Sequence, residues 1–171
     1  AGALDLKIDN ESYYNGNYCA PDEEDIDQDQ NLTEYVWQGQ NDYPVIGTPC
    51  ETSFPASDLD DGLLFFNFTD VKPDDEGEDT ISIHVQNDAW ACLDMTLTSD
   101  DDLSSTEPEL VVDALEDINN TWDGELADTI QMFWWADDGN NVYEVGEKHI
   151  TPVPVSITNM FGQDRAFFAP L

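Results

Sequence analysis

Apolar and polar residues alternate with period two over most of this chain, and this alternation constrains its fold more than any other feature. It is clearest in DTISIHVQ, where Ile81, Ile83 and Val85 share one face and polar residues occupy the other. Successive side chains of a strand point to opposite faces of a sheet, so the pattern predicts strands with one buried face. We expect strands at residues 3–9, 33–37, 63–69, 79–86, 89–98, 130–136 and 153–157.

Only one longer helix is expected, at residues 109–118. Thr106 and Glu109 have the spacing of a capping box, and apolar residues follow at helical spacing. A second short helical turn is expected at residues 124–128. The fold class predicted is therefore mainly all-β, most simply a jelly-roll β-sandwich with one or two short helices in an insertion. No repeat or change of composition marks a domain boundary.

The charge of the chain limits its partners and its habitat. There are 39 Asp and Glu residues against 4 Lys and Arg, a formal net charge of −35. Nucleic acid is excluded as a direct partner, because phosphates require cations, and anionic membrane surfaces are disfavoured. No apolar run approaches the ~18 residues of a membrane span, so no membrane insertion is expected. Such self-repulsion requires strong salt or bound divalent cations, which is typical of a very saline habitat or of an acidic, calcium-rich extracellular protein.

Cysteines and asparagines provide candidate covalent sites. Cys19 and Cys50 flank a polar, loop-like stretch and are expected to form a disulfide. The third cysteine, Cys92, then has no assigned partner. Cys92 is either an ordinary small residue or the partner of a cysteine in another chain. N-x-S/T sequences, the acceptors of N-glycans in exported proteins, occur at Asn10, Asn31, Asn67 and Asn119.

One acidic loop is a candidate calcium site. The stretch WWADDGNNVYEVGE offers carboxylate and amide oxygens around Gly139, and calcium binds six to eight oxygens. The alternative is a solvated hairpin turn in an acid-rich chain. A weaker second candidate is the stretch SDLDDG at residues 57–62. The expected ligands of the main site are Asp137, Asp138, Asn140, Glu144 and Glu147.

Motifs of enzymes are absent from the sequence. Neither of the two histidines, His84 and His149, lies in a zinc-protease motif, and no nucleophile elbow, phosphate-binding loop or C-x-x-C is present. His84 belongs to the outward face of its strand and is expected at the surface. Any spacing of carboxylates arises by chance among 39 of them, so paired carboxylates are not evidence for acid–base catalysis. We therefore expect a protein that is not an enzyme.

Four blocks of sequence, in this order, resemble a family of exported proteins: AGALDLKID…YYNG, FNFTDVKPDDEGEDTISIHVQND, TLTSDDD…STEPEL and GELADTIQMFWWADDGNNVYEVGE. The family is that of the TasA/camelysin-like proteins processed by SipW-type signal peptidases, in the version found in halophilic archaea. The resemblance covers roughly residues 1–147. One departure is Asp74, which stands where the family usually has glycine.

The resemblance implies a subunit of an extracellular filament, pilus or biofilm-matrix fibre at the cell surface, exported and freed by signal-peptide cleavage. It implies residues 1–9 as a donor strand, with Leu4, Leu6 and Ile8 inserted into the next copy, and residues 10–171 as a single jelly-roll domain. Other copies of the chain, arranged head to tail in a homopolymer, are then the partners. Periodicity alone leaves the alternative that this strand pairs within its own sheet as an ordinary first strand.

A second function is kept open by the aromatic residues. The chain is alternatively a monomeric, calcium-stabilised cell-surface adhesin or carbohydrate-binding module. Sugars stack on exposed aromatic rings, and the alternation over residues 130–135 places aromatic side chains on both faces of the expected strand. The candidates for such stacking are Trp122, Trp134 and Trp135.

Overall fold

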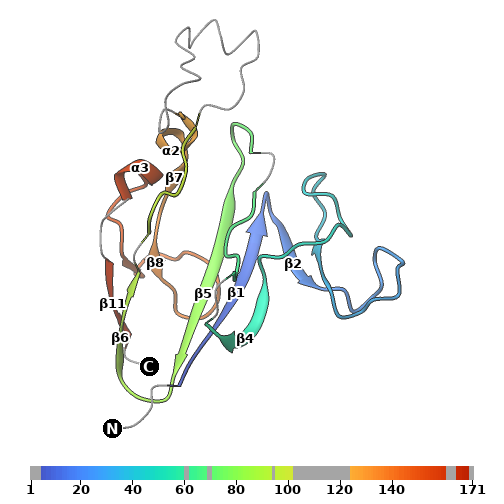
Figure 1. The fold of residues 1–171 in the computed structure, drawn as a ribbon, viewed down its shortest axis with the longest axis horizontal. Helices are drawn as coiled ribbons and strands as arrows, with labels where there is room; N and C mark the ends of the chain where they lie inside the picture. Colours follow the sequence, from blue (N-terminus) through green and yellow to red (C-terminus); the bar gives the residue numbers. More distant parts are fainter. Residues whose placement is uncertain are drawn as a thin grey trace, which may run out of the picture. The chain divides into compact units, whose positions relative to one another are not determined.

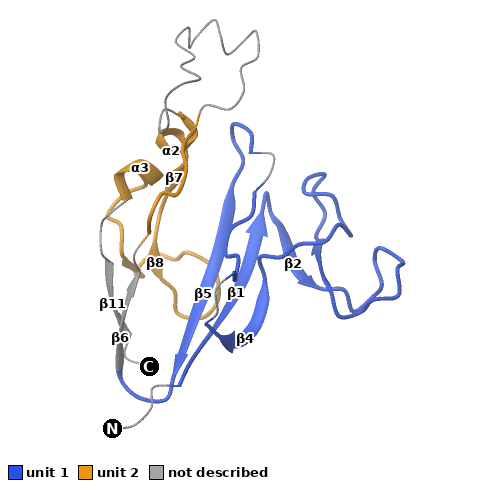
Figure 2. Ribbon diagram, in the orientation of Figure 1, with its two compact units in different colours: residues 1–88, 171 blue, residues 89–170 orange. Residues whose placement is uncertain are grey.

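The computed structural model describes residues 5–59, 62–68, 71–93, 95–101, 124–160 and 165–169, with the backbone alone for 89–93 and 165–169. The chain divides into two compact units, residues 1–88 with residue 171 and residues 89–170 (Figure 2). The helix expected at 109–118 lies outside the described residues. In the described part, no helix is long and apolar enough to cross a membrane.

The first unit is built on one antiparallel sheet (Figure 1). Its strand order is β3-β2-β1-β4, and β5 pairs with β1 as well, so β1 is the strand on which the sheet is assembled. The strands are β1 (Leu6–Tyr14), β2 (Asn17–Pro21), β3 (Tyr35–Gln38), β4 (Phe54–Asp58) and β5 (Gly77–Val85).

A tight hairpin joins β1 to β2. Tyr14 pairs with Asn17, and the two residues between them, Asn15 and Gly16, have φ angles of 50° and 77°. Positive φ at both central positions is the requirement of a type I′ turn, whose twist matches that of the flanking strands, and Asn-Gly is its preferred sequence. The hairpin therefore gives β1 a partner that follows it in the chain.

The pairing of β1 corrects the expectation of a separate donor strand at residues 1–9. From Leu6 onward β1 pairs with β5 residue by residue, and its other edge pairs with β4 at Lys7, Ile8 and Asn10. Ile8 is 7% exposed and Leu6 is half-buried in the same chain, while Leu4 lies outside the described residues. β1 also continues through the expected boundary after residue 9, because β5 supplies pairing partners as far as Tyr14.

A disulfide and a group of aromatic rings form the core of the first unit. Cys19 in β2 is bonded to Cys50, and both are buried beside Tyr14 and Trp37. The ring of Tyr14 lies 4.5 Å from that of Phe68 and 6.4 Å from that of Trp37, centroid to centroid. Apolar area removed from water stabilises by about 25 cal/mol per Å², and aromatic pairs add to this. The expected disulfide is thus confirmed, and it lies within the core.

The described part of the second unit contains three short antiparallel ladders and two helical turns. α2 matches the turn expected at 124–128. The ladders pair β6 (Ala89–Leu93) with β11 (Arg165–Ala169), β7 (Gln131–Met132) with β10 (Val155–Ser156), and β8 (Trp135–Ala136) with β9 (Lys148–His149); the helices are α2 (Leu126–Thr129) and α3 (Ile157–Met160).

The structure is mainly β with antiparallel sheets and few short helices, as expected. The jelly-roll arrangement stays a prediction. Residues 62–68 form no strand, although a strand was expected at 63–69; the carbonyl of Phe65 accepts a hydrogen bond from the Asn10 side chain instead. β2 and β4 were not expected. Asp74 has φ of 73°, so an aspartate adopts the left-handed conformation that glycine favours.

Candidate functional site

The expected calcium loop connects β8 and β9 as a hairpin. Trp135 pairs with His149 and Ala136 with Lys148, which brings the two ends of the acidic stretch together. Asp137, Asp138 and Glu147 each place a carboxylate oxygen within 4.8 Å of the other two. Three carboxylates at this separation match the oxygen ligands that calcium prefers, although calcium requires further oxygens to complete its shell.

Hydrogen bonds from the turn hold these carboxylates in place. Asp137 Oδ2 accepts the N–H groups of Gly139 at 2.7 Å and Asn141 at 3.2 Å, while Glu147 Oε1 accepts that of Asp138 at 3.1 Å. Burial would raise the pKa of Asp137, but hydrogen bonds from the backbones of Asn141, Gly139 and Val142 and from the Trp135 side chain together lower it. Asp137 is therefore ionised at neutral pH, as a metal ligand must be.

Of the two other expected ligands, Asn140 stabilises the turn, and the carboxylate of Glu144 lies outside the group. Asn140 Oδ1 accepts the N–H of Val142 at 2.9 Å and so serves the turn itself. Glu144 donates its backbone N–H to Glu147 Oε2 at 2.7 Å, but its carboxylate is not among the grouped oxygens. The structure thus brings together three of the four predicted carboxylates.

Four aromatic rings lie on the same hairpin. Phe133 and Trp135 are stacked at 5.9 Å between centroids, since residues two apart in a strand share a face. Tyr143 meets Phe133 edge-on at 5.4 Å, and its hydroxyl lies 2.5 Å from His149 Nε2. Tyr143 is 43% exposed. Of the three tryptophans expected to stack on sugars, Trp135 belongs to this group and is half-buried, Trp134 does not belong to it, and Trp122 lies outside the described residues.

A second acidic loop, at residues 22–34, groups its carboxylates in a way that was not predicted, although residues 21–30 were expected to form an acidic loop. Carboxylate oxygens of Asp22, Asp25 and Asp27 lie within 4.8 Å of one another, and so do those of Asp27, Asp29 and Glu34. Burial, followed by repulsion from Asp29 and Asp27, raises the pKa of Glu34. The signal in the sequence was the alternation Asp25-x-Asp27-x-Asp29, which places acidic side chains at every second position of a loop.

The loop is shaped by its own side chains. Asp22 is fully buried, and its two carboxylate oxygens accept the N–H of Ile26 at 2.8 and 2.9 Å. Asp25 Oδ1 accepts the N–H of Gln30 at 2.8 Å, and Gln30 has φ of 69°. Short polar side chains stabilise turns in this way. The loop is therefore folded around its carboxylates.

The weaker candidate at residues 57–62 is not assembled in the described part. Asp58 lies 3.3 Å from Lys7 Nζ in the neighbouring strand β1, so its carboxylate already has a cation beside it. Asp60 and Asp61 lie outside the described residues.

The structure separates the glycosylation candidates. Asn10 is 1% exposed within β1 and its amide nitrogen donates inside the protein, so a glycan on it is incompatible with the folded unit and that prediction is wrong. Asn31 and Asn67 are exposed, as a glycan acceptor must be. Asn119 lies outside the described residues. The backbone of Cys92, the unassigned cysteine, pairs with Ala166 in the β6–β11 ladder.

Comparisons with protein-family models, with curated proteins and with solved structures found no match to this chain.

Proposed function

We propose that this chain is a structural subunit of an extracellular filament or biofilm-matrix fibre, in which copies add β-strands to one another's sheets. The observation that carries the proposal is the outer edge of β5. This nine-residue strand pairs with β1 on one side, and no described strand pairs with its other side. An unpaired edge presents a row of N–H and C=O groups that accepts a strand from another molecule.

Three features that often protect such an edge in a monomer, proline, lysine and a β-bulge, are missing from β5, whereas charged side chains are present at Glu78 and Asp79. Its sequence, GEDTISIHV, contains neither proline nor lysine, and its register with β1 is continuous over nine residue pairs without a bulge. Short length, lysine, proline and bulges are the common devices that prevent edge-to-edge association. β5 therefore has the properties of an acceptor edge.

The net charge supplies a different control of association. At −35 per copy, subunits repel each other in dilute salt. The Debye length falls from about 8 Å at 0.15 M to about 3 Å at 1 M ionic strength, so brine removes most of this repulsion. In strong salt the repulsion is screened and another copy can reach the edge, whereas in dilute salt the repulsion keeps copies apart. This behaviour fits a fibre that assembles outside a cell in a saline habitat. The disulfide and the family resemblance support the extracellular location.

The contact between copies must join two different surfaces for a fibre to grow. A heterologous, head-to-tail contact propagates without limit when its rotation does not close a ring. β1 is engaged in its own sheet, so the incoming strand comes from another part of the neighbouring copy and adds beside β5.

Electron microscopy and sedimentation of the purified chain in molar NaCl test the proposal, with Ser82→Pro and Ile83→Pro as variants. Neighbouring residues of a strand direct their N–H groups to opposite edges, so one of these prolines removes a bond to β1 and the other removes an outward N–H. We expect the proline that removes the outward N–H to abolish filaments while the unfolding temperature of the unit is largely kept. Ile83→Ala controls for the lost side chain. Filaments that survive in the variant that stays folded contradict strand addition at β5.

The aromatic group beside the acidic hairpin favours a second candidate function. Phe133, Trp135, Tyr143 and His149 surround one another next to the three grouped carboxylates. Aromatic rings with adjacent polar groups suit sugars, as in a monomeric, calcium-stabilised adhesin or carbohydrate-binding module. A chain that stays monomeric in brine, binds polysaccharide and loses that binding in Trp135→Ala would establish this function in place of the filament.

A further inference from the structure

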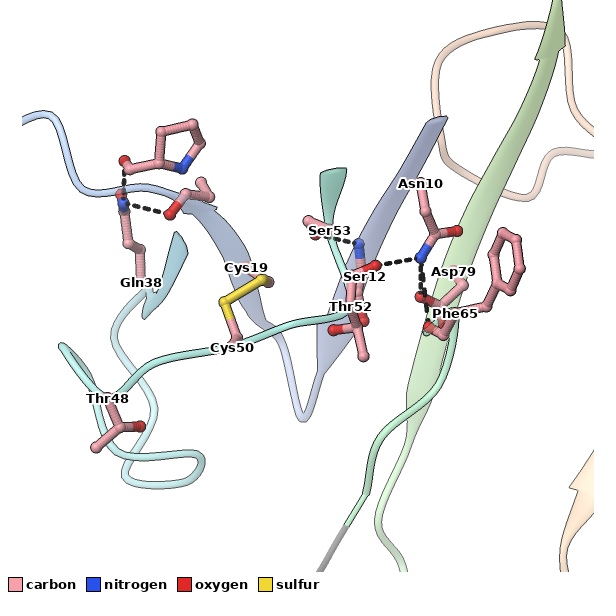
Figure 3. Close-up of a disulfide and its surroundings, with 12 residues drawn as sticks. Asn10, Ser12, Cys19, Gln38, Thr48, Cys50, Thr52, Ser53, Phe65 and Asp79 are labelled. Carbon is pink, nitrogen blue, oxygen red and sulfur yellow. Dashed lines mark hydrogen bonds between the residues drawn. A yellow bond between two sulfur atoms is a disulfide. The ribbon is translucent and has the colours of Figure 1, made fainter. Parts of the chain in front are cut away.

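Two strands pair with the same edge of β1 and leave a gap between them. β4 pairs with the first part of β1, as far as Asn10, and β2 pairs with its last two residues, Tyr13 and Tyr14. No described strand pairs with Ser12 on this edge, and its backbone N–H is donated to the Ser53 hydroxyl at 2.9 Å instead (Figure 3). A side chain thus takes the place of a neighbouring strand at this point of the sheet.

The gap forms a cavity of about 410 Å³. This volume lies within the range of small-molecule sites, roughly 300–1,000 Å³. On the β2 side, Gln38 Nε2 donates to the backbone carbonyls of Ala20 at 3.4 Å and Pro21 at 2.9 Å, which fixes this side of the cavity (Figure 3). Most of the lining consists of aromatic rings and prolines: Tyr13, Tyr18, Tyr35, Phe54, Pro21 and Pro55.

The tyrosine rings keep surface that a ligand can contact. Tyr13 and Tyr18 are cross-strand partners on the face of the sheet opposite the core, with ring centroids 6.4 Å apart and ring planes inclined by 46°. At this distance and angle the two rings do not stack face to face, and Tyr18 is 41% exposed. Burial raises the pKa of Tyr35, because water has limited access to this phenol.

The charged residues that line the cavity are acidic. Asp9 and Glu11 lie on the same face of β1 as Tyr13, because residues two apart in a strand share a face. Among the described residues that line the cavity there is no lysine, arginine or histidine. His84, whose Nε2 lies 2.5 Å from Asp9 Oδ2, is outside the lining. Rings and carboxylates together favour a ligand that is both apolar and positively charged.

We propose that this cavity binds a small quaternary ammonium cation, with its methyl groups against the tyrosine rings and its charge beside Asp9 and Glu11. Aromatic rings attract cations, most strongly where water is excluded, and quaternary ammonium groups are the ligands that such sites recognise. Inorganic cations such as calcium require six to eight oxygen ligands, which a lining of rings and prolines does not supply. The proposal is independent of filament formation.

Titration of the full chain with choline and with its neutral isostere, 3,3-dimethyl-1-butanol, tests the proposal by calorimetry or NMR. The two molecules have the same shape, and only choline is charged. Molar NaCl in the buffer screens the general attraction of choline to the acidic surface. We expect saturable binding of choline and about tenfold weaker binding of the alcohol. Equal affinities, or the absence of saturable choline binding, would overturn the proposal.

Two pairs of variants locate the site. Tyr18→Ala removes one ring and should weaken choline binding by about two- to thirtyfold, whereas Tyr18→Phe keeps the ring and most of the affinity. Glu11→Gln should weaken binding as well, and Glu76→Gln, the same change at an exposed turn outside the cavity, should leave it unchanged. Thermal unfolding without ligand shows that each variant is folded.

Choline binding that survives in both Tyr18→Ala and Glu11→Gln would overturn the assignment to this cavity. Loss of binding in Trp135→Ala, with both of those variants unaffected, would place the cation at the aromatic group of the second unit instead.

Discussion

Ser12 and Asp79 face each other across the ladder between β1 and β5, on the buried side of the sheet. The alternation of β1 places Ser12 inward together with Ile8, Asn10 and Tyr14, so a carboxyl group enters a region closed to water. Burial raises the pKa of Asp79 to about 7, partly opposed by hydrogen bonds from Asn10 and Ser12. A carboxyl group with such a pKa makes the stability of the unit depend on pH.

The first prediction concerns the dependence of the free energy of unfolding on pH. The folded pKa of Asp79 lies above its unfolded value of about 3.9, so its favourable contribution is complete below pH 4 and is lost as pH rises through 7. We expect Asp79→Asn to remove this loss and to stabilise the chain at pH 8 by an amount on the order of a few kcal/mol at most. Denaturant unfolding at pH 5 and pH 8 measures it. Parallel pH profiles for the wild-type and variant chains would contradict the assignment.

A different carboxyl group acts in the opposite direction. Hydrogen bonds from the Tyr14 hydroxyl at 2.6 Å, the Lys72 backbone and the Asn15 side chain lower the pKa of Asp75. Its contribution is present above its unfolded pKa of about 3.9 and is lost only as pH falls through the lower folded value. The two groups therefore affect separate pH ranges, and Asp75 does not confuse the comparison between pH 5 and pH 8.

The second prediction concerns Gly39, which precedes the loop around Asn17. Gly39 has φ of +141°, and a Cβ there would lie 2.2 Å from Asn17 Oδ1 and 3.1 Å from Asn17 Cα. Asn17 is fully buried and binds the loop through Gln40, Asn41 and Pro44, so it cannot move away cheaply. We expect Gly39→Ala to lower the free energy of unfolding by roughly 3 kcal/mol, from strain and overpacking together.

Gly146→Ala is the matched control for that variant. Gly146 has φ of +122°, but nothing lies within 4 Å of the added Cβ. It carries the backbone cost alone, about 1–3 kcal/mol. Equal destabilisation by the two variants would show that the clash with Asn17 is absent.

The third prediction concerns the disulfide between Cys19 and Cys50. The bond closes a 31-residue separation that includes the acidic loop 22–34. Such a cross-link restricts the unfolded chain and typically contributes about 2–4 kcal/mol. We expect Cys19→Ala with Cys50→Ala to lose this amount in denaturant unfolding and to make the chain insensitive to reductant. Cys92→Ala should leave the reductant effect unchanged; loss of the effect in that variant would point to a different pairing.

The local sequence pattern predicted the positions of strands better than it predicted which strands pair with each other. The run of Ile81, Ile83 and Val85 marked β5 correctly, because alternation is written in the residues themselves. Two of the partners of β1, β4 and β5, lie more than 40 residues away in the chain, so alternation at residues 3–9 left this pairing open. The Asn15-Gly16 pair is the sequence signal of the hairpin between β1 and β2, and it was missed when β2 was not predicted.

The candidate sites show the same limit. A turn joins Asp137 to Glu147 within one hairpin, so sequence proximity was enough to predict most of that group. The Asn10 side chain donates to three other segments of the chain, at Thr52, Phe65 and Asp79. None of these residues belongs to a local sequence pattern that would predict the contact. Only the fold shows that Ser12 and Asp79 meet, or that the Asn10 sequon is buried.

The last prediction concerns calcium at the acidic hairpin. Bringing Asp137, Asp138 and Glu147 within 4.8 Å of one another costs repulsion that a divalent cation removes. An ion that binds only the folded state stabilises it by RT ln(1 + [L]/Kd), about 2.7 kcal/mol at a hundredfold excess over Kd. We expect millimolar CaCl₂ to raise the unfolding temperature in brine and a chelator to reverse the effect. Because the loop at residues 22–34 also offers carboxylates, Asp137→Asn and Glu147→Gln should reduce the calcium shift, and Asp27→Asn should report the contribution of that loop. Glu144→Gln removes one charge from the same hairpin without touching the grouped oxygens, so it should leave the shift intact. A shift that responds equally to Glu144→Gln and Glu147→Gln would mean that calcium acts on the general negative charge of the hairpin and not at a defined site.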